Sequence, residues 1–168
     1  MSEAMKATRL LPLLLCLSPL VACSGESTPT FSDPIAALDK GDAALAAKDI
    51  PTAIAAYEYA SQNGDEGQRK EALSGLLSVQ LDIGESDAAV QAFQNLTKGG
   101  SLTTEELLDI ANECVKARLV DPANAVIDYA TSNNEGVADA FSRPIAAAEL
   151  LEKEGPGADL SSLGYTGD

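Results

Sequence analysis

One short sequence pattern occurs three times and decides the fold: residues 53–57 read AIAAY, residues 89–93 read AVQAF and residues 125–129 read AVIDY. Each copy begins with alanine and ends with an aromatic residue four positions later, and successive copies are 36 residues apart. An acidic residue stands four positions before each alanine: Asp49, Glu85 and Asp121. A fixed period between about 20 and 50 residues is typical of a solenoid. The sequence therefore predicts three stacked units.

Each copy is expected in the second of two helices, because residues four apart share one helix face. In the first unit, Asp33 can cap a first helix that has Pro34 in its first turn. Residues 48–50 break this helix, and residues 63–67 end the second one. In the second unit, Gly84 closes the first helix and Ser86 is expected to cap the second.

The third unit opens with a capping box, formed by Thr103 and Glu106. Asp121 and Pro122 are expected to supply the cap and the first-turn proline of its second helix. A further helix over residues 138–154 has one polar face, as a terminal repeat needs for solubility. Residues 155–168 are expected to be a disordered tail.

A small residue and an aromatic residue four positions apart resemble the tetratricopeptide repeat. Ala53 and Tyr57, with their counterparts in the other two copies, match the small and aromatic positions of its second helix, and Gly41 matches the small position of its first. Leu77 and Glu113 occupy that first-helix position in the other units, no Trp opens a repeat, no Pro closes one, and 36 residues exceed the usual 34. An α-hairpin solenoid outside the family is the alternative.

The resemblance implies an all-α fold. It predicts a short right-handed α-hairpin solenoid of about three repeats and a C-terminal capping helix. The repeats are expected at about 33–67, 68–102 and 103–137.

The N-terminus resembles a bacterial lipoprotein signal peptide. Lys6 and Arg9 precede an apolar stretch over residues 10–21, which is too short for a membrane-spanning helix and contains two prolines. The stretch ends Leu20–Val21–Ala22–Cys23, in the order of a lipobox. The resemblance implies cleavage of residues 1–22 and acylation of Cys23, whereas an ordinary signal peptide with a chance cysteine is the alternative. Residues 23–32 are expected to form a flexible tether.

The residue after Cys23 and the net charge bear on the location and partners of the chain. Ser24, rather than Asp, follows Cys23, which by the sorting habit of many Gram-negative lipoproteins favours the outer membrane and a periplasm-facing domain. The formal net charge of −15 argues against a nucleic-acid partner, because binding phosphates needs clustered Lys and Arg. It also argues against attraction to anionic lipid, so a membrane location needs the covalent anchor.

The residue types present argue against catalysis. The chain has no His, which excludes Ser–His and Cys–His nucleophile pairs and His-ligated metal. No glycine-rich phosphate loop is present. Cys114 has the spacing of a core residue beside Ile110 and Ala117. We therefore expect no enzyme activity, no cofactor and no metal site.

In tetratricopeptide arrays the first helix of each pair lines a concave groove. Carried over by position, the groove residues are Leu38, Asp42, Leu45, Ser74, Ser78, Leu81, Asp82, Ile110, Cys114, Ala117 and Arg118. Members that clamp a peptide carboxylate use Lys and Asn on this face, whereas Asp42 and Ser78 stand here, so carboxylate clamping is not expected. Short apolar and acidic side chains suit a segment with basic and aliphatic residues. The alternative is that these residues only pack units together or face water.

Two functions are compatible with these observations. The first is a lipid-anchored scaffold or adaptor that binds a protein or peptide in the cell envelope. The second is a structural or self-associating lipoprotein without a separate ligand.

Overall fold

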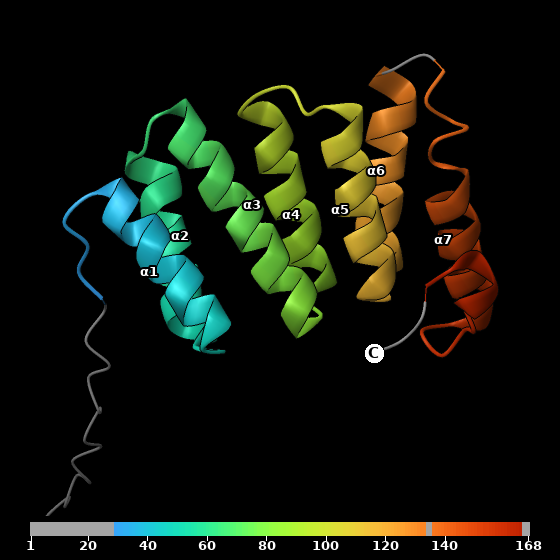
Figure 1. Ribbon diagram of the computed structural model, residues 1–168, viewed down its shortest axis with the longest axis horizontal. Helices are drawn as coiled ribbons and strands as arrows, with labels where there is room; N and C mark the ends of the chain where they lie inside the picture. The colour runs from blue at the N-terminus through green and yellow to red at the C-terminus, as the bar shows by residue number, and fades with distance from the viewer. Residues whose placement is uncertain (1–28, 134–135, 166–168) are drawn as a thin grey trace, which may run out of the picture.

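The computed structural model describes residues 29–133 and 136–165, and all regular secondary structure in this part of the chain is helical. The elements are α1 (Pro34–Ala46), α2 (Ile50–Asn63), α3 (Glu66–Ile83), α4 (Ser86–Lys98), α5 (Thr104–Lys116), α6 (Val120–Asn133), α7 (Ser142–Glu154) and the 3₁₀ helix η1 (Ser161–Leu163). Successive helices lie side by side along the long axis (Figure 1), and neighbours pack against each other. The fold is an all-α, repeat-like solenoid.

Several helices begin where capping side chains predict. Asp33 Oδ1 accepts a hydrogen bond of 2.9 Å from Ala36 N, which satisfies one free N–H of the first turn. The capping box of Thr103 and Glu106 is confirmed. A second capping box, formed by Asp65 and Gln68, starts α3 and was not expected from the sequence.

Two expected caps are wrong. Ser86 is the first residue of α4, and the residue at the cap position, Glu85, makes no side-chain hydrogen bond to the helix. Asp121 lies inside the first turn of α6, which begins at Val120. There its carboxylate still interacts favourably with the helix dipole.

The turns within the three hairpins share one geometry, and they set the true repeat length. Each turn contains one residue with positive φ: Lys48, Gly84 or Arg118. In each turn, the residue after the one with positive φ donates its N–H to the carbonyl oxygen five positions before itself. In the first turn, Asp49 N donates to Ala44 O at 2.8 Å. From Lys48 to Gly84 is 36 residues, but from Gly84 to Arg118 is 34. The expected second interval of 36 residues is wrong by two.

The corrected register changes which residues fill the third unit. Ala123 and Ile127, both buried, take the places in α6 that Ala89 and Phe93 take in α4. Ala125 and Tyr129, which the sequence alignment placed there, are only half-buried. In α5 the small first-helix position is held by buried Ala111, and not by exposed Glu113.

The buried residues form two clusters that meet at α3. One joins α1 and α2 to α3 through residues that include Ala72 and Val79. The other joins α3 to α4 and the later helices through residues that include Leu73, Leu77 and Leu81. Because α3 has apolar residues on both sides, it links two cores.

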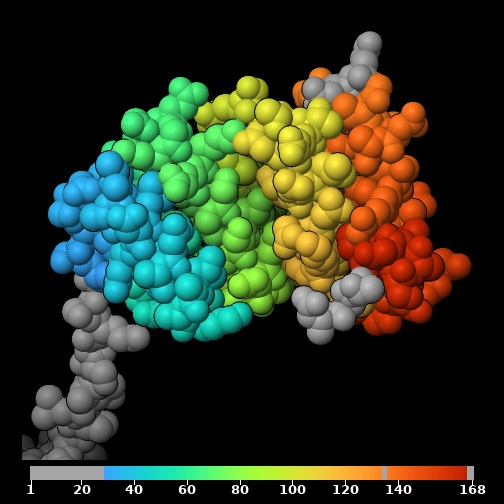
Figure 2. All heavy atoms as spheres, viewed as in Figure 1, coloured from blue at the N-terminus to red at the C-terminus, as the bar shows by residue number. Residues whose placement is uncertain are grey.

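The segment after α7 is packed, which corrects the expected disordered tail for residues 155–165. Ala158, Leu160 and Tyr165 are buried in the second core. In the space-filling view this segment, in red, is continuous with the body (Figure 2). The last helix begins at Ser142 rather than at residue 138. Residues 166–168 lie outside the described part.

The N-terminal expectations fall mostly on residues that the structure does not describe. The signal peptide, Cys23 and the tether up to residue 28 lie there. Phe31, expected in a flexible tether, packs on Tyr59 with 5.3 Å between ring centroids. No helix among the described residues is long and apolar enough to cross a membrane.

Candidate functional site

The packing between the second and third hairpins differs from the packing between the first and second. In the first junction α3 packs against both α1 and α2. In the second junction α4 packs against α6, where the rings of Phe93 and Tyr129 meet edge to face at 5.7 Å, whereas the backbones of α3 and α5 do not come close together. An open groove therefore separates α3 from α5.

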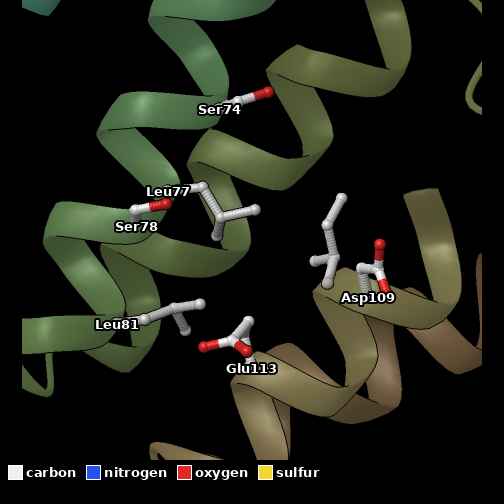
Figure 3. Close-up of a pocket in the computed structure, with 7 residues that line it drawn as sticks. Ser74, Leu77, Ser78, Leu81, Asp109 and Glu113 are labelled. Carbon is white, nitrogen blue, oxygen red and sulfur yellow. The ribbon is translucent and has the colours of Figure 1, made fainter.

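The groove has an apolar floor between polar walls. It encloses about 130 Å³ and is lined by Ser74, Leu77, Ser78, Leu81, Asp109, Ile110 and Glu113. Figure 3 shows Leu77 and Leu81 pointing from α3 across the groove, and Asp109 and Glu113 standing on α5 opposite them. The two leucines also belong to the core, so the floor is held by packing.

Helix geometry places these residues together. On α3, positions 74, 77, 78 and 81 follow the i, i+3, i+4, i+7 spacing that keeps side chains on one face. Ser74 Oγ donates to Lys70 O at 3.0 Å, so its hydroxyl is used within the helix. Among the described residues, the Ser78 hydroxyl has no hydrogen-bond partner.

The groove stays open because of two carboxylates. Residues 109, 110 and 113 of α5 correspond, 34 residues on, to Gly75, Leu76 and Val79 of α3. On α3 that side is apolar and packs toward the first hairpin. On α5 it carries Asp109 and Glu113, and burying an unpaired carboxylate is costly. The third hairpin therefore cannot press this side of α5 onto α3.

An ion pair spans one end of the groove. Lys70 Nζ of α3 lies 2.6 Å from Glu106 Oε1 of α5. The hydrogen bond from Lys70, together with those from Thr103, lowers the pKa of Glu106 to about 2. Glu106 thus caps α5 and also fixes its distance from α3.

A wider polar recess adjoins the other end. It is lined by Leu81, Asp82, Ile83, Gly84, Glu113, Lys116 and Ala117. Lys116 Nζ lies 2.6 Å from Glu113 Oε1, and this hydrogen bond raises the pKa of Lys116. Both side chains are largely exposed, so the pair stabilises the fold little. Of the charges lining the groove and this recess, the carboxylates of Asp82 and Asp109 are not paired within the described residues.

The structure brings together six of the eleven expected groove residues. Ser74, Ser78, Leu81 and Ile110 line the groove. Asp82 and Ala117 line the recess.

The other five residues do not line this groove or the recess. Leu38 and Cys114 are buried, and Leu45 packs partly buried against the first core. Asp42 accepts a hydrogen bond of 2.6 Å from Tyr57 OH. Arg118 Nη1 donates to Pro156 O and Ala158 O, at 2.9 and 2.8 Å.

Leu77, Asp109 and Glu113 were missed by the sequence reasoning. Leu77 could have been found from its spacing relative to Ser74 and Ser78. Asp109 and Glu113 could have been found only with the 34-residue register. In that register they are carboxylates at positions where the preceding repeat has a small residue and an apolar residue.

Cys114 has no role in the groove. Burial raises the pKa of its thiol to about 12, which keeps it protonated at neutral pH. It packs in the second core as a small apolar residue.

Comparisons of the chain with models of known protein families, with curated proteins and with solved structures found no match.

Proposed function

We propose that this chain is a non-catalytic adaptor of the cell envelope. Its anchor is a lipid on Cys23, and its tetratricopeptide-like solenoid faces the periplasm from the outer membrane. The groove between α3 and α5 binds a segment of a partner protein. The proposal rests mainly on one observation, an apolar floor left open between packed hairpins and edged by the carboxylates of Asp82 and Asp109, which have no partner among the described residues.

The anchor is supported by Leu20–Val21–Ala22–Cys23. The intact mass of the protein from membranes is expected to show loss of residues 1–22 and added acyl chains. Two or more chains give stable anchoring where one does not. Cys23→Ser is expected to move the protein from the membrane to the soluble fraction. An unmodified Cys23, or retention of residues 1–22, contradicts this part of the proposal.

The adaptor role is tested in intact cells with a photo-crosslinking amino acid at position 78. The matched control carries it at Ser132, an exposed serine on α6. One defined partner, crosslinked from position 78 and absent at position 132, supports the adaptor. Crosslinks only between copies of this chain favour the self-associating alternative.

Charge reversal tests how such a partner is recruited. Asp82→Lys combined with Asp109→Lys is expected to slow association at low salt, and less at high salt, because unpaired rim charges act mainly on the on-rate. Asp42 is not used, because its carboxylate accepts the hydrogen bond of Tyr57 OH. An unchanged on-rate in a folded double variant places the site elsewhere.

A further inference from the structure

Tyr57 fills the gap between α1 and α3. A β-carbon built on Gly41 of α1 would lie 2.6 Å from Tyr57 Cε1, and one built on Gly75 of α3 would lie 2.5 Å from Tyr57 Cζ. The ring therefore occupies the space between two helices that have no side chain there. Its hydroxyl donates to Asp42 Oδ1 at 2.6 Å.

Tyr165 occupies the corresponding place between α5 and α7. Its hydroxyl donates to Asn112 Oδ1 of α5 at 2.6 Å. The guanidinium of Arg143, on α7, lies 4.2 Å from the ring centroid, in cation–π distance. The tyrosine comes from the segment after α7 and not from a helix of the solenoid.

The two acceptors hold the same position in their repeats. Asp42 and Asn112 each precede the left-handed residue of their turn, Lys48 and Arg118, by six positions. The residue six positions before Gly84 is Ser78. Ser78 lines the groove between α3 and α5, and among the described residues its hydroxyl is unpartnered. The middle gap thus has a polar residue at this position but no tyrosine, and it carries the side chains of Leu77 and Asp109 where the first gap has Gly41 and Gly75.

We propose that the groove between α3 and α5 binds one tyrosine side chain of a partner polypeptide. This inference rests on the proposed adaptor function and names the side chain that the groove recognises. The ring lies on Leu77, Leu81 and Ile110, and its hydroxyl hydrogen-bonds Ser78. The groove holds about 130 Å³, less than the closed cavity of about 150 Å³ that takes a benzene ring, so the ring lies partly outside its open side.

The tyrosine is not supplied by the residues of this chain. Its seven aromatic residues are Phe31, Tyr57, Tyr59, Phe93, Tyr129, Phe141 and Tyr165. Tyr57, Phe93, Phe141 and Tyr165 are buried, and the other three are half-buried in ring pairs. Residues 1–28, 134–135 and 166–168 contain no aromatic side chain. Neither these segments nor a second copy offers a free ring.

Charge defines the sequence around the tyrosine. Asp82 and Asp109 flank the groove and have no ion-pair partners among the described residues, whereas Glu113 forms an ion pair with Lys116. A bound segment therefore places Lys or Arg on both sides of its tyrosine. Opposite charges at the rim select the partner and raise its on-rate.

The first test titrates the full-length protein in detergent with labelled nine-residue peptides, read by fluorescence anisotropy. The reference peptide has a central tyrosine between lysine pairs, and in three others Phe, Leu or Ala replaces the tyrosine. The Tyr peptide is expected to bind a few-fold more tightly than the Phe peptide and at least tenfold more tightly than the Ala peptide. Equal affinities for the Tyr and Ala peptides, or no binding of the Tyr peptide at millimolar concentration, overturn the inference.

The second test fills the groove from within. Ser78→Tyr is expected to abolish binding of the Tyr peptide without lowering the midpoint of thermal unfolding, because position 78 is exposed. Ser132→Tyr, the same change on exposed α6, is expected to leave binding unchanged. Retained binding in the folded Ser78→Tyr variant overturns the inference.

The two proposals fail separately. If a partner crosslinked from position 78 is not displaced by the Tyr peptide, the tyrosine inference falls and the adaptor stands. If no partner is found, the adaptor falls, and the peptide titrations still decide whether the groove binds tyrosine.

Discussion

Tyr57 explains why two glycines lie inside helices of this chain. A glycine inside a helix lowers its stability by about 0.5–1 kcal/mol relative to alanine. Gly41 and Gly75 face each other across the Tyr57 ring, where even a methyl group would overlap it. Close approach of the helices to the ring therefore outweighs helix propensity at these positions.

Gly75→Ala is expected to destabilise the protein by about 1–3 kcal/mol, because the methyl group must displace the Tyr57 ring. The control is Gly67→Ala in the exposed first turn of α3, where a β-carbon would make only an ordinary contact with Asp65 Oδ1 at 3.5 Å. That change is expected to stabilise by about 0.5–1 kcal/mol. Chemical unfolding of both variants measures the difference. A loss of stability at Gly67 equal to that at Gly75 would contradict the packing of Tyr57.

The lowered pKa of Glu106 predicts part of the loss of folding stability at low pH. Its folded pKa of about 2 lies below its ordinary value of 4.5, mainly through the hydrogen bond from Lys70. A lowered carboxyl pKa contributes stability above the unfolded pKa, and this is lost as pH falls through the folded pKa. The contribution is present above pH 4.5 and disappears toward pH 2. The side chain is 39% exposed, so solvent screening reduces its size.

Glu106→Gln is expected to flatten the fall of the unfolding midpoint between pH 4.5 and pH 2. Thermal unfolding across this range measures it. Glu105→Gln, on the same turn, controls for the loss of one negative charge without touching Lys70. If Glu106→Gln follows the wild-type curve, the Lys70–Glu106 pair contributes nothing to stability in solution.

Residue roles could be predicted from sequence where they depend on neighbours in the chain. The caps at Asp33 and Thr103 depend on residues three positions away, and both were found, whereas the caps expected at Ser86 and Asp121 were misplaced by one or two residues. Asp42 was assigned to the groove by family position, and its hydrogen bond with Tyr57 could not be predicted because Tyr57 comes from another helix. Cys114 was placed both in the core, by its spacing, and in the groove, by family position, and the structure supports only the core.

At the scale of elements, the hairpin turn is the unit that repeats. The same left-handed turn joins α1 to α2, α3 to α4 and α5 to α6, with glycine only in the second. For a residue with a β-carbon, the left-handed conformation costs about 1–2 kcal/mol. Lys48 and Arg118 both have this strained conformation. Arg118 differs from Lys48 because its side chain also donates hydrogen bonds to the segment after α7.

Lys48→Gly is expected to stabilise the protein by up to about 1 kcal/mol, since relief of the left-handed strain exceeds the added entropy of the unfolded chain. Arg118→Gly removes the same strain but also the hydrogen bonds to Pro156 O and Ala158 O. It is therefore expected to be neutral or destabilising. Denaturant midpoints compare the two, and equal stabilisation of both would show that the Arg118 hydrogen bonds contribute nothing.

The turns also show why the repeat length was misjudged. AVIDY at residues 125–129 aligns with the earlier copies, yet Ala123 and Ile127 are the residues that fill their places. Both pairs are four residues apart, so helical periodicity fits either register. The position of the left-handed residue decides between them, and arginine at 118 gives no sign of such a turn in the sequence.

For the whole molecule, the repeat made the all-α solenoid predictable, while the groove depended on a departure from the repeat. Asp109 and Glu113 stand where α3 has Gly75 and Val79, and they keep α5 from packing onto α3. The packed C-terminal segment was also missed. Its buried residues, Ala158, Leu160 and Tyr165, are spread among glycines and polar residues, without a helical period.

The two cores predict that the molecule responds locally to core substitutions. In repeat proteins, stability is approximately a sum of terms within units and between neighbours. Leu160, from the segment after α7, is buried in the second core, and Leu38 of α1 is buried in the first. Leu160→Ala and Leu38→Ala are each expected to cost about 2–5 kcal/mol.

Hydrogen exchange read by mass spectrometry locates each effect. Leu160→Ala is expected to reduce protection in α5, α6 and α7 and to leave α1 and α2 near wild type. Leu38→Ala is expected to do the reverse. In both variants α3 responds partially, because it contributes to both cores. If either variant lowers protection equally in all helices, the solenoid unfolds as one cooperative unit, and the two cores do not respond separately.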